Sequence, residues 1–178
     1  MPGPVSEYCA KVDLGLGKEK GMTDVKKEST NITFADDPYW RRKKLSEMTK
    51  SEWEMLCDGC GRCCLNKLED GKTGEIFHTD VACRLLDPET CRCTSYDDRK
   101  RFVPECQYLT HRNLKNYPWL PSTCAYRLVS EGKHLYWWHP LVSGKSETVH
   151  KAGISVRYRV VSERDCDDLE NHVVSWPS

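Results

Sequence analysis

Four cysteines crowd into the eight residues Cys57–Cys64, which read CDGCGRCC. Three of them, Cys57, Cys60 and Cys63, recur at steps of three residues, and a glycine follows Cys60 where the chain must turn sharply. One loop with this spacing can wrap a single centre. The stretch therefore predicts one of three chemistries, namely disulfide bonding, thiol–disulfide exchange or metal binding.

The surroundings of this stretch favour metal binding over disulfide bonding. The amino-terminal residues hold no apolar run long enough for a signal-peptide core, and no later stretch approaches the length of a membrane span. We therefore expect a cytoplasmic protein with no membrane partner, and structural disulfides rarely persist in that compartment. The chain has 11 cysteines, an odd number that cannot pair completely within one molecule.

Five more cysteines downstream complete the set of expected ligands. The predicted metal ligands are Cys57, Cys60, Cys63, Cys64, Cys83, Cys91, Cys93, Cys106 and Cys124. Such a set suffices for two tetrathiolate zinc sites, for a bridged two-metal cluster, or for one iron–sulfur cluster plus one zinc ion. The expected cofactor is therefore zinc or iron, an iron–sulfur cluster included. Cys9 and Cys166, near the ends of the chain, are expected to be plain thiols.

Cys64 follows Cys63 directly, so its side chain should leave the backbone in a different direction. We expect it to serve a second centre or to bridge two, with partners drawn from Cys83, Cys93 and Cys106.

Histidines are weaker candidates for ligands. His78 and His111 are minor candidates, and His139 lies between a tryptophan and a proline. A buried histidine hydrogen-bonded to the backbone is the favoured interpretation of His139.

Other chemical motifs fail on inspection. The CGRC sequence resembles a thioredoxin-type dithiol, but no βαβ pattern surrounds it. The SGKS sequence at Ser143–Ser146 lacks the upstream glycine of a phosphate-binding loop. No general acid–base constellation stands out, so catalytic residues are not identified and enzymatic activity is left open.

Short elements must position the cysteines. Pro38, capped by Asp37, should begin a helix that carries Leu45, and a capping box of Thr49 and Glu52 predicts a helix over 50–56 that leads into the cysteine loop. Further helices are predicted in YDDRKRF, in LPSTCAYRLVSEG and in SETVHKAG. Strands are predicted at Val81–Leu86 and Cys91–Cys93, paired as a hairpin, and in LYWWHPLV and ISVRYRVVSE.

These elements predict an α+β fold, a small and loop-rich metal-stabilised single domain with short helices and a small antiparallel sheet. Residues 1–34 are polar without apolar periodicity and are expected to be a disordered tail. The cysteine-rich metal-binding domain is expected over 35–165, and 166–178 is expected to be a carboxyl-terminal tail. Lys and Arg number 27, as do Asp and Glu, so no basic field favours nucleic acid as a partner.

Several stretches together resemble a known bacterial family. YWRRKKLSEMTKSEWEMLCDGCGRCCLNKLED, VACRLLD, WLPSTCAYRL and LYWWHPLVSG are similar to the YcgN family, within the YkgJ-type group that is named for CxxCxxCC and described as zinc- or iron-chelating. In that group's pattern the positions after the four cysteines correspond to Cys83, Cys93, Tyr96, Arg99 and Cys106. The pattern places a proline right after the arginine, whereas here the proline is Pro104, so the loop before the last cysteine is longer.

The resemblance implies metal binding without an established activity. The favoured function is a metal-stabilised module that interacts with another macromolecule. The alternative is an iron–sulfur protein in electron transfer, cluster-assisted modification or redox sensing, and metal delivery is a third possibility. The sequence identifies neither the partner nor the oligomeric state.

Overall fold

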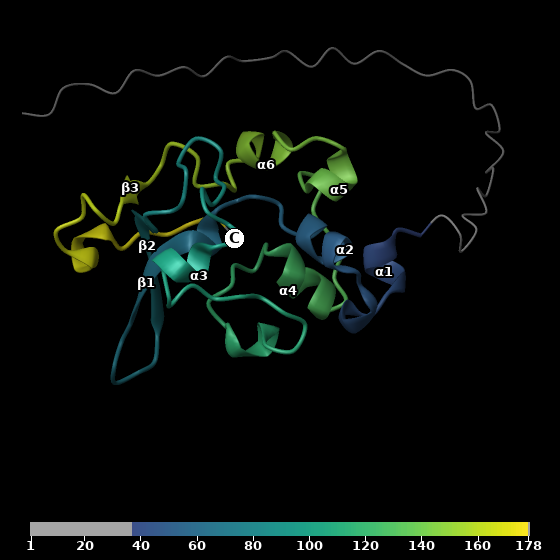
Figure 1. Cartoon of the computed structure of the whole chain (residues 1–178), viewed down its shortest axis with the longest axis horizontal. Coiled ribbons are helices and arrows are strands. Elements are labelled where there is room, and N and C mark those ends of the chain that lie inside the picture. Colours follow the sequence, from purple (N-terminus) through teal and green to yellow (C-terminus); the bar gives the residue numbers. More distant parts are fainter. Residues whose placement is uncertain (1–36, 178) are drawn as a thin grey trace, which may run out of the picture.

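Short elements joined by long loops make up the fold in the computed structural model, which describes residues 37–177 (Figure 1). The predicted tail over 1–34, and Cys9 with it, lies outside the described residues. The elements are α1 (Tyr39–Arg42), η1 (Leu45–Glu47), α2 (Lys50–Met55), η2 (Arg62–Cys64), β1 (Leu65–Glu69), β2 (Ile76–Ala82), α3 (Arg99–Phe102), η3 (Leu114–Asn116), α4 (Ala125–Ser130), α5 (Pro140–Ser143), α6 (Thr148–Lys151), β3 (Val161–Ser162) and η4 (Leu169–His172), where η marks a 3₁₀ helix.

The sheet has three strands in the order β1-β2-β3. β1 and β2 pair antiparallel as a hairpin, and β3 joins β2 in parallel, with Val81 opposite Val161. The α+β class with a small sheet is therefore confirmed. The sheet is mixed and not purely antiparallel as predicted, because β3 runs parallel to β2. The predicted pairing of 81–86 with 91–93 is reduced to one antiparallel bridge between Leu86 and Cys93.

The helix before the cysteine loop forms as its capping box predicts. The Thr49 hydroxyl accepts a hydrogen bond from the Glu52 amide, and the Glu52 carboxylate accepts one from the Thr49 amide at 2.8 Å. These bonds satisfy amide groups that an α-helix leaves without partners at its start. α2 then ends at Met55, so that Leu56, which is fully buried, fixes the start of the loop at Cys57.

Three predictions for the elements are wrong. The ISVRYRVVSE stretch, predicted as a strand, contains only the two-residue strand β3 at Val161–Ser162. The first helix ends at Arg42, and Leu45 begins a separate 3₁₀ turn instead. The LYWWHPLV stretch is not a strand, because the His139 side chain accepts a hydrogen bond from the Leu141 amide and caps α5. Trp137 is 61% exposed, which a half-buried strand would not place there.

The buried apolar residues form four small clusters in place of one core. One lies between β1, β2 and the following loop, around Leu65, Leu86 and Val156. The largest surrounds Leu56 and Tyr126, between α2 and α4. Two smaller clusters lie around Val149 and under α4. Each cluster buries little apolar area, so that the loops between them need another source of stability.

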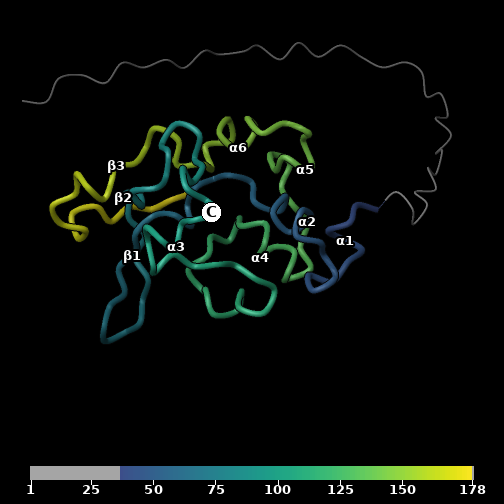
Figure 2. The backbone as a smooth tube through the Cα atoms, in the orientation of Figure 1, coloured from purple at the N-terminus to yellow at the C-terminus, as the bar shows by residue number. Residues whose placement is uncertain are grey.

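The carboxyl-terminal segment packs against the sheet and ends in the middle of the molecule (Figure 2). Val173 forms a bridge with Thr79, the indole of Trp176 donates to the Thr79 carbonyl at 3.0 Å, and the Arg62 guanidinium donates to the Pro177 carbonyl. The boundary between domain and tail at residue 165 remains a prediction. In the structure, Val173 and Trp176 of the segment that follows it contact Thr79 of β2. No helix within the described residues is long and apolar enough to cross a membrane.

Candidate metal centre

The cysteine loop is held in shape by two glycines and by contacts with residues far along the chain. Gly59 and Gly61 both have a φ of +76°, which L side chains rarely adopt. A Cβ built on Gly61 would lie 2.7 Å from a methyl carbon of Val156. The Val156 amide donates to the Cys60 carbonyl at 2.9 Å, and the Cys60 amide donates to the Asp58 carboxylate at the same distance. The loop is therefore a fixed frame for its cysteines.

His139 supports the start of this loop and is not free to bind a metal. Its side chain is almost fully buried, Nδ1 accepts from the Leu141 amide at 3.1 Å, and Nε2 lies 3.0 Å from the Leu56 carbonyl oxygen. Because Nδ1 accepts, Nε2 carries the proton and donates to Leu56. The interpretation of His139 as a core histidine is confirmed. His78 lies on β2, and His111 is exposed in a loop.

Eight of the nine predicted ligands influence one another electrostatically, and we call them the thiol cluster. Its members are Cys57, Cys60, Cys63, Cys64, Cys83, Cys93, Cys106 and Cys124. Burial raises the pKa of Cys57 to about 12, with the neighbouring Cys63 and Asp58 adding to the effect. Burial also raises the pKa of Cys124 to about 12, and Cys63 again contributes. A thiolate is therefore costly at these positions unless a cation neutralises it.

Cys63 is more acidic than an ordinary thiol. A hydrogen bond with Cys64 lowers the pKa of Cys63 to about 7, against burial and with help from the Lys67 ammonium. The same hydrogen bond is the main reason that the pKa of Cys64 is raised well above its usual value. The pair therefore shares one proton near neutral pH.

The expectation that the side chains of Cys63 and Cys64 diverge is wrong. Their sulfur atoms lie 3.8 Å apart, although the two residues are neighbours in the 3₁₀ turn η2. A tetrahedral zinc ion with Zn–S bonds of about 2.3 Å separates its sulfurs by about 3.8 Å, so the two thiols have the spacing of shared ligands. Whether Cys64 serves a second centre stays a prediction.

The downstream cysteines approach the loop from four other segments. Cys83 follows β2, and its amide donates to the Cys64 carbonyl at 2.9 Å. Burial raises the pKa of Cys83, and Cys106 and Cys93 add to the effect. Cys106 follows α3, while Cys124 is the residue that precedes α4. The fold thus gathers thiols that are up to 67 positions apart, from Cys57 to Cys124.

Cys91 is the predicted ligand that stands apart. Its side chain is 4% exposed and packs in the apolar cluster around Leu65 and Val156, and its φ is +55°. Burial raises the pKa of Cys91, and the main opposing influences are Ser155 and Arg157 and not another cysteine. Cys60, in contrast, packs on Val149 and still influences the cluster. Its role as a ligand, like that of Cys91, remains a prediction.

The donor set of the thiol cluster fits zinc or iron. Thiolates are soft ligands that select zinc and iron–sulfur clusters over magnesium or calcium. Of the eight cysteines, only Cys60 is buried, and the other seven are half-buried or exposed. Between residues 37 and 177 no three Cys, His, Asp or Glu side chains already stand at the spacing of a metal site.

Several charged groups around the cluster are not evident from the cysteine spacing. Lys67 reaches back along β1, donates to the Leu65 carbonyl at 2.6 Å, and lies 4.3 Å from the Trp119 ring centre. Arg99 lies 3.9 Å from the ring centres of both Tyr96 and Tyr108, close enough to Cys106 to oppose the rise of its pKa. These cations offset the negative charge of bound thiolates. LNKLE does not alternate apolar and polar residues, so the sequence offers no strand signal for β1, and so none for Lys67.

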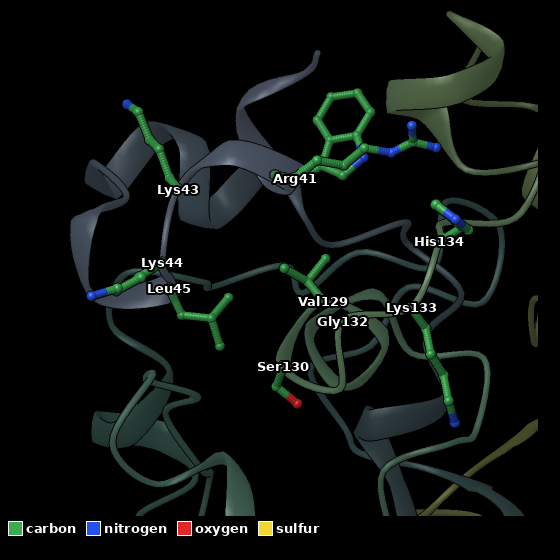
Figure 3. Close-up of a pocket in the computed structure, with 10 residues that line it drawn as sticks. Arg41, Lys43, Lys44, Leu45, Val129, Ser130, Gly132, Lys133 and His134 are labelled. Atoms are coloured by element: carbon green, nitrogen blue, oxygen red, sulfur yellow. The ribbon is translucent and has the colours of Figure 1, made fainter. Parts of the chain in front are cut away.

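A basic cavity lies away from the cysteines, between α1 and the end of α4 (Figure 3). Its volume is about 410 Å³. Figure 3 shows Lys43 and Lys44 extending away from Leu45 and Val129. Lys43 pairs with Glu52 at 2.6 Å, and Lys133 pairs with Glu131 at the same distance. Most of its positive charge is therefore neutralised, and none of the predicted ligands lines it.

Comparison with known proteins points in the same direction as the donor set. Residues 56–125 match the family model described as "CxxCxxCC: Putative zinc- or iron-chelating domain". A UPF0260 protein of Rhizobium leguminosarum bv. trifolii is 60% identical over 144 residues, which are 80% of this chain and 90% of the relative. A UPF0260 protein of Parvibaculum lavamentivorans is 57% identical over 148 residues, 82% of this chain and 97% of the relative. No solved structure matches the chain.

Proposed function

The chain belongs to the UPF0260 family of bacterial proteins, and on that premise we propose that its thiol cluster binds zinc or iron and that the bound metal holds the domain together. The observation that carries this proposal is the origin of the cysteines. They come from the end of α2, from η2, from the end of β2, from the loop before α3, and from the residues after α3 and before α4. A metal centre would cross-link all of these segments at once.

The divided apolar core supports a structural role for the metal. Its four clusters are small, and helices of at most six residues within the described chain have little stability of their own. Ligand bonds would replace the missing core, as they do in small metal-dependent domains whose folding free energy comes from metal binding. The product is a rigid, metal-stabilised module suited to binding another macromolecule.

An iron–sulfur protein is the second candidate, and solvent access to the cluster favours it. Cys63 is exposed, so an iron–sulfur cluster bound through it would be within reach of electron-transfer partners and oxidants. An accessible cluster could exchange electrons or respond to oxidants, and its potential would depend on nearby hydrogen bonds and cations such as Lys67. This many free thiols requires a reducing compartment, so we place the protein in the cytoplasm. From the motifs it shares with that family, we also assign it to the YcgN branch of the CxxCxxCC proteins.

Anaerobic purification with metal analysis and a visible spectrum tests the proposal. Stoichiometric zinc without colour would favour the structural module, and iron with sulfide and a broad visible absorption would favour the second candidate. Strong chelator under reducing conditions should abolish the near-ultraviolet circular dichroism of the aromatic residues packed around Tyr126. Protein that is free of both metals as isolated, or that keeps its spectrum and melting temperature after metal removal, contradicts the proposal. Cys166→Ser, outside the cluster, is the matched control.

A further inference from the structure

Arg62 is a buried cation inside the cysteine loop. The residue is 4% exposed, although arginine is almost never fully buried unless it is paired. In the chain it lies between Cys60 and Cys63, two of the predicted ligands. A charge in such a position is costly unless an opposite charge lies nearby, so its surroundings indicate what it does.

Two segments far along the chain hold the guanidinium of Arg62 in place. Nη1 donates to the hydroxyl of Thr123 at 3.5 Å and to the carbonyl oxygen of Pro177. Thr123 is itself 3% exposed and directly precedes Cys124, another predicted ligand. The guanidinium therefore lies between the cysteine loop and the segment that carries Cys124.

Neither acceptor neutralises the charge of Arg62. The hydroxyl and the carbonyl are uncharged groups, and Nε is buried without an acceptor among the described residues. No carboxylate within residues 37–177 forms an ion pair with this side chain. A buried cation with these partners still requires negative charge from another group.

The thiol cluster can supply that negative charge. Burial lowers the pKa of Arg62, and Cys60 and Cys124 oppose this decrease, as does Asp58. Burial, and after it the carboxylate of Asp58, raises the pKa of Cys60, so Asp58 adds to the negative charge at the thiols. A divalent ion bound by four thiolates keeps a net charge of about −2. An occupied centre would therefore need a cation close to its ligands, and Arg62 is a buried cation at that place.

The Pro177 carbonyl reaches Arg62 because the carboxyl-terminal segment, residues 173–177, is anchored on β2. The Val174 amide and the Trp176 indole donate to carbonyl oxygens of β2 at 2.9 and 3.0 Å. The guanidinium carbon of Arg159 lies 4.9 Å from the Trp176 ring centre. These contacts fix the segment up to the residue that binds Arg62.

From these contacts we propose that Arg62 is the internal counterion of the metal centre and that the carboxyl-terminal segment positions it. Arg62 is not a ligand: its charge offsets that of the thiolates, and the bond to Pro177 keeps the guanidinium from turning out to solvent. The inference rests on the proposed metal binding and adds a residue and a segment that the cysteine pattern does not include. Any event that lifts the segment from β2 would then weaken metal binding.

Competition with a chelator tests this inference on the full-length protein with the metal that it is purified with. The measured quantity is the chelator concentration that removes half of the metal. Arg62→Met removes the charge and keeps a long side chain, and it should lower that concentration by about tenfold to a hundredfold, the usual effect of losing a group that supports metal ligands. Arg62→Lys keeps the charge and should restore most of the loss.

Arg127→Met is the matched control. Arg127 also donates to a backbone carbonyl, that of Leu120 at 2.9 Å, but it already pairs with Glu131. This variant should lose its metal at the same chelator concentration as the wild type.

A shortened chain that ends at Val174 keeps Arg62 and lacks the Pro177 carbonyl, so it should lose metal more readily than the wild type. Near-ultraviolet circular dichroism checks the fold of each variant, and the shortened chain decides the question if Arg62→Met does not fold. Wild-type protein without metal contradicts the proposed function itself. On metal-loaded protein, wild-type affinity in Arg62→Met or in the shortened chain, or equal losses in Arg62→Met and Arg62→Lys, would overturn the inference.

Discussion

The imidazole of His139 donates a hydrogen bond of 3.0 Å to the carbonyl oxygen of Leu56, across 83 positions of the chain. Leu56 is the last residue before the cysteine loop, so this bond ties the loop to α5. We expect His139→Phe to lower the free energy of unfolding by about 1–3 kcal/mol, because it leaves a buried carbonyl oxygen without a donor. Urea denaturation of the metal-loaded protein measures the change. His134→Phe, at an exposed position, should leave stability nearly unchanged.

Stability should fall as the solution becomes mildly acidic. Burial lowers the pKa of His78, His139 and His150 below the ordinary value near 6.5. Below about pH 6.5 the unfolded chain therefore binds more protons than the folded one, and the free energy of unfolding decreases. Loss of metal in acid also lowers the stability of every variant. The informative quantity is therefore the difference in stability loss between wild type and variant. Wild type should lose more stability than His139→Phe between about pH 7.5 and 6, and equal losses would contradict the assignment.

Metal content should separate the cluster cysteines from the one that stands apart. Cys64→Ser should lose part or all of the metal, because Cys64 lies 3.8 Å from Cys63 and influences Cys57 and Cys83. Cys91→Ala should keep the metal content of the wild type and lose only packing in its apolar cluster. Native mass spectrometry measures the metal content of both variants, with Cys166→Ser as the control. Retention of all metal in Cys64→Ser, or its loss in Cys91→Ala, would show that the two cysteines have been assigned the wrong way round.

Alkylation should find Cys63 first in metal-free, reduced protein. Cys63 is exposed and its pKa is lowered to about 7, whereas burial raises the pKa of Cys57 and Cys124 to about 12. Only the thiolate reacts, so the rate at Cys63 should rise steeply around pH 7 and level off above it. Peptide mass spectrometry after brief iodoacetamide treatment locates the label. Faster labelling of Cys57, or a rate that rises only above pH 9, would contradict the pKa order.

Local signals in the sequence predicted the parts of the fold that depend on local bonds. The capping box of Thr49 and Glu52 predicted α2, and with it the position of Cys57. The α5 region failed because its aromatic pattern is typical of a strand, while the decisive bond, from the Leu141 amide to His139, uses a residue that rarely caps helices. β1 was missed because its partner β2 begins only at Ile76, and pairing is a tertiary property.

The candidate site, like the fold, was predictable only in the part that depends on local sequence. Spacing alone predicted the thiols of the cluster, since cysteines three residues apart are typical of a metal-binding loop. It could not separate Cys91 from Cys93, because the positive φ of Cys91 turns its side chain into an apolar cluster. Asp58 and Arg92 are 34 positions apart in the sequence, and only the fold brings them to the wall of one small cavity.

The supports of the cysteine loop are made long after the loop itself. His139, which bonds to Leu56, lies 83 positions later in the chain. The Pro177 carbonyl, which bonds to Arg62, lies 115 positions later. On the ribosome the four cysteines of Cys57–Cys64 therefore emerge as a bare, flexible peptide, before any frame exists to orient them. The cysteines of the loop are thus synthesised before the residues that hold the loop in place. Metal that binds during synthesis therefore binds an unstructured peptide. The folded geometry of the loop forms only after Pro177 has been added.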